Sequence, residues 1–188
     1  MALPASDDFA GSGALSASWT VLDGSTTRVS DQADAAGVGA NGSLWNADTF
    51  NDDQYAEVTI GSTTPNCGPA TRLTVSGATG TGYVVTATGA NITLYRWNGN
   101  ESYTSIAALG GSVTTGDVVR LESEGTTHRV YKNGTQVGSD QTNATYTTGS
   151  AGMFLYDATA TLNAWEGGNL AAGGGGGSVK RLTLLGVG

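Results

Sequence analysis

The sequence predicts an all-β protein built from short antiparallel strands, and three observations lead to this fold class. Apolar and polar residues alternate in short runs such as residues 56–60 and 119–122, which is the period of a half-buried strand. Thirty glycines among 188 residues supply positions for tight turns. No stretch has apolar residues at helical spacing, so no long amphipathic helix is expected.

Five stretches in the first half of the chain are expected to form strands after an opening segment that contains Phe9 and Trp19. The strongest is residues 54–60, where Ala56, Val58 and Ile60 share one face. The five expected strands are residues 43–46, 54–60, 72–75, 83–86 and 92–97.

The second half of the chain contains the clearest turn. Asn133-Gly134 lies between apolar alternations, and both central residues of a tight hairpin turn need a positive φ angle that asparagine and glycine adopt readily. Further alternating runs at residues 119–122, 153–156 and 162–165 complete a meander of short strands.

Twelve apolar side chains are expected to be buried, because each lies on the apolar face of an alternating stretch or in the aromatic opening segment. They are Phe9, Trp19, Val58, Ile60, Leu73, Val75, Val85, Leu94, Val119, Leu121, Val130 and Leu155.

Three segments near the C-terminal end carry a resemblance to a known superfamily. The Val-Tyr-x-Asn-Gly-x-x-Val hairpin at residues 130–137, the Gly-Ser-Ala-Gly-Met segment at 149–153 and the closing strand with Trp165 resemble the C-terminal half of the concanavalin A-like (laminin-G-like) jelly roll. The resemblance implies an antiparallel jelly-roll β-sandwich over residues 1–168. It does not set the chemistry, because the superfamily includes lectins, glucanases, lyases and structural virion proteins.

The charge argues against a nucleic-acid partner, and the hydropathy argues against a membrane span. The net charge is −8, and an acidic body repels a phosphate backbone, so no nucleic-acid binding is expected. No apolar run approaches the length of a membrane span. Residues 1–13 lack the basic and apolar regions of a signal peptide, so we expect synthesis in a host cytoplasm without a cleaved signal.

No residue is expected to be catalytic. Retaining glycosidases need two carboxylates about 5 Å apart, and the catalytic strand of related glucanases carries Glu-x-Asp-x-x-Glu, which the pair Glu122 and Glu124 does not match. His128, the only histidine, is expected at the surface or an edge, and Cys67 is expected to be an inert turn thiol. The sequence therefore predicts no enzyme.

Metal and cofactor sites have little support. The resemblance leaves open a structural calcium site at Asp7, Asp8 and Asp157, because some members hold calcium near the terminal strands. No loop shows dense spacing of oxygen ligands, and no His/Cys cluster or phosphate-binding glycine loop is present. We expect neither a metal nor a cofactor.

One segment has the composition of a sugar site. Tyr95 and Trp97 lie on the strand face opposite Ile92 and Leu94, and amides and a third aromatic residue follow directly. An aromatic ring offers an apolar face for a sugar, while neighbouring amides set its orientation. Packing within the sandwich or a subunit contact are the alternatives. The candidate glycan-binding residues are Tyr95, Trp97, Asn98, Asn100 and Tyr103.

The chain changes character after Gly168. Residues 169–178 read as a flexible glycine-rich linker that contains five consecutive glycines, and residues 179–188 form an apolar arm. Such an arm can add a strand to an exposed sheet edge of another chain, and folding back on its own domain or disorder are the alternatives. The docking residues would be Val179, Lys180, Arg181, Leu182, Leu184, Leu185 and Val187.

These observations lead to two functional hypotheses. The first is a non-enzymatic structural or adhesive component of a bacteriophage virion, such as a capsid decoration, neck or tail-fibre protein, which binds other virion proteins or copies of itself through the arm. This hypothesis places the protein in the virion. The alternative is a bacterial carbohydrate-binding, lectin-like module that recognises cell-surface glycans.

The arm gives a test of the first hypothesis. A chain that ends at Gly173 should remain folded, because the sandwich is complete by Gly168, but it should lose assembly or particle attachment. Thermal unfolding measures the fold, and co-sedimentation with the particle measures attachment. Normal assembly of the shortened chain would contradict the docking hypothesis.

Overall fold

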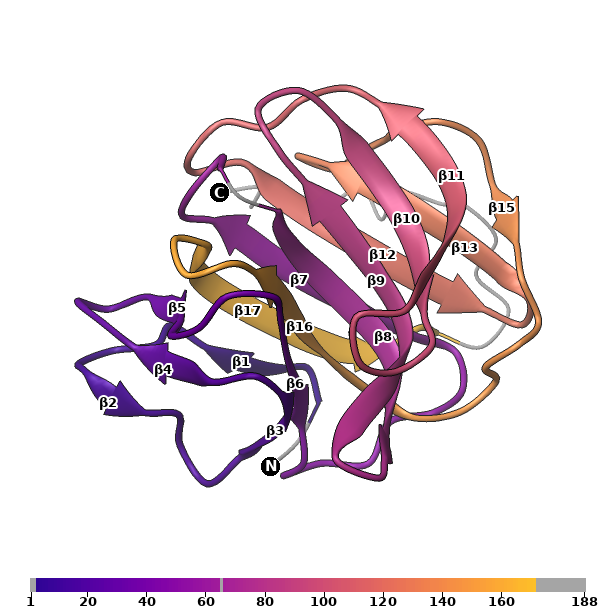
Figure 1. Cartoon of the computed structure of the whole chain (residues 1–188). Helices are drawn as coiled ribbons and strands as arrows, with labels where there is room; N and C mark the ends of the chain where they lie inside the picture. The colour runs from indigo at the N-terminus through magenta and orange to yellow at the C-terminus, as the bar shows by residue number, and fades with distance from the viewer. Residues whose placement is uncertain (1–2, 65, 172–188) are drawn as a thin grey trace, which may run out of the picture.

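The computed structural model describes residues 3–64 and 66–171 and shows a sandwich of two antiparallel β-sheets (Figure 1). Every strand pairing is antiparallel, and the described residues contain no helix. Accordingly, this part of the chain has no helix that could cross a membrane. The predicted all-β, jelly-roll sandwich is therefore confirmed.

One sheet has ten strands within the described residues, and we call it the first sheet. Eight strands follow one another across it, while β1 pairs with β17 and β15 pairs with β13. In order across the sheet the strands are β14 (Thr135–Gln136), β13 (Thr127–Lys132), β12 (Val118–Glu124), β7 (Gln54–Ile60), β17 (Thr161–Asn169), β5 (Ala33–Ala35), β4 (Thr26–Arg28) and β2 (Gly13–Ala14), with β1 (Ala5–Asp7) and β15 (Gln141–Thr142) beside it.

The second sheet has seven strands in the same part of the chain. In order they are β11 (Tyr103–Gly110), β10 (Ile92–Trp97), β9 (Thr79–Ala87), β8 (Cys67–Ser76), β16 (Ser150–Tyr156), β6 (Ala40–Trp45) and β3 (Trp19–Asp23).

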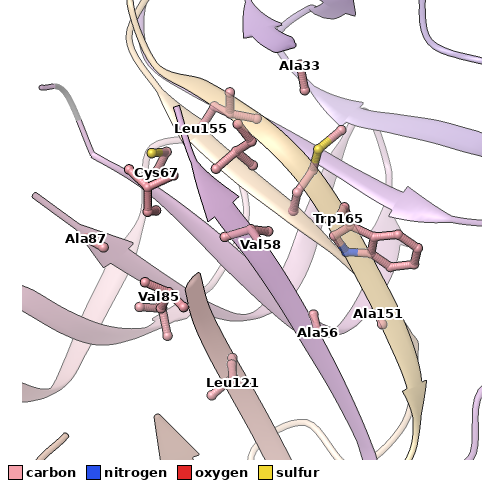
Figure 2. Packing of buried hydrophobic residues seen from close by; sticks show 14 of the residues in the cluster. Ala33, Ala56, Val58, Cys67, Val85, Ala87, Leu121, Ala151, Leu155 and Trp165 are labelled. Carbon is pink, nitrogen blue, oxygen red and sulfur yellow. The ribbon is translucent and has the colours of Figure 1, made fainter. Parts of the chain in front are cut away.

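The main core fills the space between the sheets. Alternation sends Ala56 and Val58 of β7 and Leu121 of β12 inward from the first sheet, where they meet Val85 of β9 and Leu155 of β16 from the second sheet (Figure 2). All five side chains are almost completely buried. Apolar burial of this kind is the dominant favourable contribution to folding.

Four aromatic rings pack against one another in this core. Trp45 stacks on Trp165 with ring centroids 5.1 Å apart, and Trp19 packs edge-on against both. Phe9 lies 6.1 Å from Trp19. The indole N–H groups are satisfied, since Trp19 donates to Asp7 and Trp165 donates to the carbonyl of Gly152. The opening segment is therefore fastened to the closing strand β17.

Eleven of the twelve side chains expected in the core are buried, and Val75 is the exception with 63% of its surface exposed. The reason lies in β8, where Arg72 has a φ of 52° and the pairing with β9 shifts register between Thr71 and Thr74. This bulge changes which side chains share a face. Leu73 is consequently buried on the outer face of the sheet, and Val75 projects from the hairpin just before its turn.

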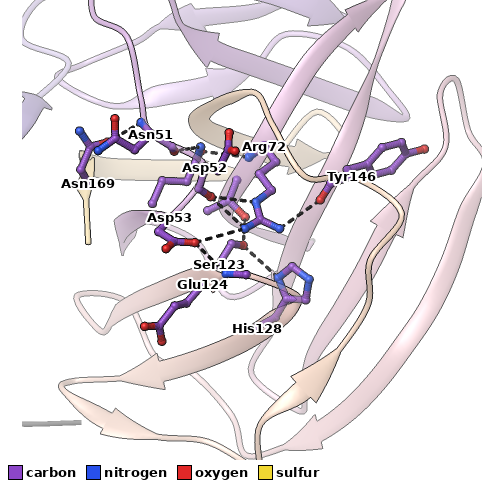
Figure 3. Close-up of polar contacts among 12 residues, drawn as sticks. Asn51, Asp52, Asp53, Arg72, Ser123, Glu124, His128, Tyr146 and Asn169 are labelled. Carbon is purple, nitrogen blue, oxygen red and sulfur yellow. Dashed lines mark hydrogen bonds and ion pairs between the residues drawn. The ribbon is translucent and has the colours of Figure 1, made fainter. Parts of the chain in front are cut away.

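A buried polar network connects β8 to neighbouring loops (Figure 3). The Arg72 guanidinium is 1% exposed, donates from Nε and Nη2 to the carbonyl of Asp52, and donates from Nη1 to the carbonyl of Tyr146. Its own backbone N–H donates to Gln54. Two loops are thus fastened to β8 by one side chain.

His128 belongs to the same buried region, and its expected place at the surface or an edge is wrong. Its Nε2 lies 3.1 Å from the carbonyl of Asn143, which can only accept, so Nε2 carries the proton. Nδ1 then accepts from Ser123 Oγ at 2.9 Å, and Ser123 in turn lies 2.7 Å from Thr71. Burial lowers the pKa of His128 to about 4.

This buried histidine predicts a loss of stability in mild acid. The unfolded chain binds a proton at His128 below pH 6.5, whereas the folded chain does so only near pH 4. The free energy of unfolding should therefore fall as the pH is lowered from 6.5 to 4, by up to about 3 kcal/mol from this residue. Urea unfolding at several pH values measures it.

The control is His128→Gln, which should be less stable at pH 7 but should lose less stability across this pH interval. Parallel pH dependences for the two proteins would show that His128 is not the group responsible.

Candidate ligand-binding pocket

The outer face of the second sheet carries a second apolar cluster. Its buried members are Leu22, Ala40, Leu44, Ala70, Leu73, Val84, Trp97 and Phe154. As predicted, Tyr95 and Trp97 lie on the face of β10 opposite Ile92 and Leu94, which enter the main core. This sheet therefore buries side chains on both faces.

The turn between β10 and β11 folds over this outer face (Figure 1). Trp97 Nε1 donates to the carbonyl of Asn100 at 2.6 Å, and the backbone N–H of Asn100 donates to Thr79 Oγ1 at 2.7 Å. Glu101 Oε1 accepts from the backbone N–H of Ala40, at the start of β6, at 2.7 Å. The turn is thus fastened to β9 on one side and to β6 on the other.

Trp97 fits between this turn and the sheet because the sheet residues beneath its ring are glycines. A Cβ atom added to Gly42 would lie 2.6 Å from the Trp97 ring, and one added to Gly80 would lie 3.0 Å from it. Trp97 is fully buried and packs edge-on against Phe154 at 5.6 Å. Trp97 therefore offers no face for a ligand to stack on, and the alternative of packing within the sandwich holds for this residue.

Beside Trp97 the outer face contains a pocket of about 320 Å³. Its walls combine four aromatic rings with an amide, a hydroxyl and a carboxylate. The lining residues are Asn66, Thr86, Tyr95, Glu101, Tyr103, Phe154 and Tyr156.

Tyr103 is the centre of the aromatic wall. Its ring centroid lies 6.3 Å from Tyr95, 5.8 Å from Phe154 and 6.3 Å from Tyr156, and each contact is edge-on. Such edge-to-face pairs are a favourable arrangement of aromatic rings. The first residue of β11 is thus brought into contact with β16, which lies four positions away in the sheet.

The negative charge of Glu101 acts on two tyrosine hydroxyls of the pocket. Burial, followed by the Glu101 charge, raises the pKa of Tyr103, and the Glu101 charge is the main cause of the raised pKa of Tyr156. Both phenols therefore stay protonated at neutral pH. The Tyr103 hydroxyl is buried and makes no hydrogen bond of ordinary geometry within the described residues, although Glu101 acts on it electrostatically.

The structure brings together part of the predicted glycan site. Tyr95 and Tyr103 line the pocket, whereas Asn98 and Asn100 do not. The Asn98 side chain accepts from Arg96 Nε and donates to Thr104 Oγ1. Asn100 has a φ of 47° and serves the turn through its backbone.

Five lining residues were not among the predicted site residues. Phe154 and Tyr156 alternate with core residues along β16, a pattern that places them on the outer face. Glu101 is adjacent to the predicted residues in sequence. Asn66 and Thr86 carry no signal in the sequence, because their proximity to the tyrosines results from the strand order alone.

The remaining candidate residues lie outside this pocket. Glu122 pairs with Arg120 at 2.9 Å and Glu124 with Arg129 at 2.7 Å, on the outer face of the first sheet. Cys67 is buried at the start of β8, and burial raises its pKa to about 12, so its thiol is not a nucleophile at neutral pH.

The aspartates considered for calcium are engaged elsewhere. Asp7 accepts from the backbone N–H of Phe9 and from Trp19 Nε1, and Asp8 accepts from Ala10. Asp157 accepts from the backbone N–H of Gly39. In residues 3–64 and 66–171 no group of three or more His, Cys, Asp or Glu side chains could hold a metal ion.

The predicted linker and arm fall largely outside the described residues. β17 continues through Asn169, whose side chain accepts from the backbone N–H of Asn51, and Leu170 donates to the carbonyl of Asp53. The docking residues 179–187 are not described.

Solved structures of similar fold include a carbohydrate-binding module and carbohydrate-active enzymes. The carbohydrate-binding module CBM66 from Bacillus subtilis has a TM-score of 0.58 and 18% sequence identity, over 81% of this chain and 92% of that one. A xylan β-1,4-xylosidase from Bacillus halodurans has a TM-score of 0.54 and 12% identity, over 90% of this chain and 40% of that one. The Crh5 transglycosylase has a TM-score of 0.53 and 12% identity, over 90% and 85%.

At these identities the likeness shows the fold alone, an antiparallel β-sandwich of the jelly-roll type. No protein-family model and no curated protein sequence matches the chain. These likenesses give no support to the expected bacteriophage structural role.

The glycine floor under Trp97 gives a mutational test. Gly42→Ala should destabilise the protein by about 1–3 kcal/mol, because the new methyl group would overlap the buried Trp97 ring. Gly37→Ala is the matched control, since its nearest neighbour would be at 3.9 Å and its φ is not in the left-handed region. Equal stability of the two variants in urea unfolding would show that Trp97 does not depend on Gly42.

Proposed function

We propose that this protein is a non-enzymatic carbohydrate-binding domain that holds a glycan in the pocket on the outer face of the second sheet. The observation that carries the proposal is the composition of the pocket wall. Four aromatic rings stand beside an amide, a hydroxyl and a carboxylate in a space of about 320 Å³. This volume falls within the range of small-molecule sites, about 300–1,000 Å³.

The chemistry of the wall suits a sugar. The C–H faces of a pyranose or furanose ring pack against aromatic faces, and Tyr95, which is partly exposed, offers its ring for this contact. Sugar hydroxyls both donate and accept, so the amide of Asn66, the hydroxyl of Thr86 and the carboxylate of Glu101 can each bind one.

The same wall favours binding over hydrolysis. Glycosidases of the usual kind flank the scissile bond with two carboxyl groups, and the pocket lining contains one carboxylate, that of Glu101. Glu122 and Glu124 are ion-paired to arginines on the other sheet. The structural likeness to a carbohydrate-binding module supports the same proposal at the level of the fold.

The virion hypothesis stays a prediction. It rests on the arm at residues 179–188, which lies outside the described residues, and on the presence of structural virion proteins in the superfamily that the sequence resembles. The pocket favours the glycan-binding alternative.

Glycan binding is tested with a panel of neutral and anionic oligosaccharides on an array, followed by calorimetry on those that bind. Tyr95→Ala should weaken binding at least about tenfold, because it removes the stacking surface. Tyr131→Ala, on the first sheet, is the matched control and should bind as the wild type does.

Two outcomes would contradict the proposal. One is a folded wild-type protein that binds no member of the panel. The other is a Tyr95→Ala variant whose affinity equals that of the wild type.

A further inference from the structure

We propose that Glu101 makes the pocket selective for uncharged glycans and rejects those that carry a carboxylate, sulfate or phosphate group. The inference rests on the proposed function, and it adds the chemical class of the ligand and the residue that determines it.

Glu101 is held in place before any ligand arrives. Its Oε1 accepts from the backbone N–H of Ala40 at 2.7 Å, and a Cβ atom on Gly39 would clash with this same oxygen. The carboxylate lines the pocket and acts on the hydroxyls of Tyr103 and Tyr156. A fixed carboxylate in this position accepts well from a neutral sugar hydroxyl, since hydrogen bonds to charged acceptors are the stronger kind.

No positive charge compensates Glu101 within the described residues. Six described side chains are cationic, and none of them lines the pocket. Arg96, on the neighbouring strand β10, points to Asn98, Thr104 and Thr145 instead. The other five are Arg28, Arg72, Arg120, Arg129 and Lys132, and each bonds to groups that do not line the pocket.

Two further carboxylates strengthen the negative potential at this end of the sheet. Asp157 accepts from the backbone N–H of Gly39, next to the Ala40 N–H that Glu101 binds. Asp23 accepts from Thr79 Oγ1, and its charge acts on the Tyr103 hydroxyl. An anionic group on a ligand would therefore meet like charges, and no arginine or lysine of residues 3–64 and 66–171 lines the pocket to pair with it. Glu101 is solvent-exposed, so this repulsion is screened in part, but it remains unfavourable at hydrogen-bonding distance.

The test compares pairs of related ligands in which one member is neutral and the other carries carboxylate groups. The probes are cellotetraose and its C6-oxidised form, galactotetraose and galacturonotetraose, and xylotetraose with and without a glucuronate branch. For each pair whose neutral member binds, calorimetry should show the neutral member binding at least about tenfold more tightly.

Glu101→Gln should narrow this ratio to about threefold or less, mainly by improving the affinity for the anionic member. The amide oxygen of glutamine can still accept from Ala40, so the turn should stay in place. Glu124→Gln is the matched control, because it removes the same net charge from the other sheet and should leave the ratio unchanged. Thermal unfolding of both variants establishes that each is folded.

The outcomes separate the inference from the proposed function. If wild-type protein binds no member of any pair, the proposed function fails and the inference fails with it. If the anionic members bind as tightly as the neutral ones, glycan binding stands and the selectivity is wrong. If Glu124→Gln narrows the ratio as much as Glu101→Gln does, overall charge is responsible and Glu101 is not the determinant.

Discussion

The burial of Trp97 on the outer face of the second sheet is the contact on which the pocket depends. The ring occupies the space above Gly42 and Gly80, where any larger residue would collide with it. Its N–H fixes the carbonyl of Asn100, and the turn that follows then places Glu101 and Tyr103 over the sheet. Without the packing of Trp97 and its hydrogen bond to Asn100, the turn that brings Tyr103 of β11 against Phe154 of β16 would not be held in place.

The two outer faces of the sandwich have different chemistry. On the first sheet Arg120 lies over the Tyr55 ring at 3.5 Å and pairs with Glu122, and Arg129 pairs with Glu124. The outer face of the second sheet carries aromatic rings and small residues instead. Within the described residues no arginine or lysine lines the pocket, because Arg96 on β10 bonds to Asn98, Thr104 and Thr145 and the other cations lie on the first sheet or in the network around Arg72. In that part of the chain the carboxylate of Glu101 therefore has no cation beside it in the pocket lining.

Two different kinds of contact hold the connecting segments to the sandwich. Stacked tryptophans and Phe9 fasten the opening segment to β17. Arg72 and His128 satisfy loop carbonyls that would otherwise be buried without partners. An unpaired buried polar group is costly, so these side chains position the loops as firmly as apolar packing does elsewhere.

The sequence by itself determined the fold class and most of the core, because a period of two sends alternate side chains to opposite faces of a strand. It also placed Tyr95 and Tyr103 in a candidate site. It missed the exposure of Val75, since a single left-handed residue at Arg72 shifts the alternation. Only the tertiary structure decided that Trp97 is buried and that Glu101, Phe154 and Tyr156 face the two tyrosines, because strand order and the folded-over turn join residues that no local pattern connects.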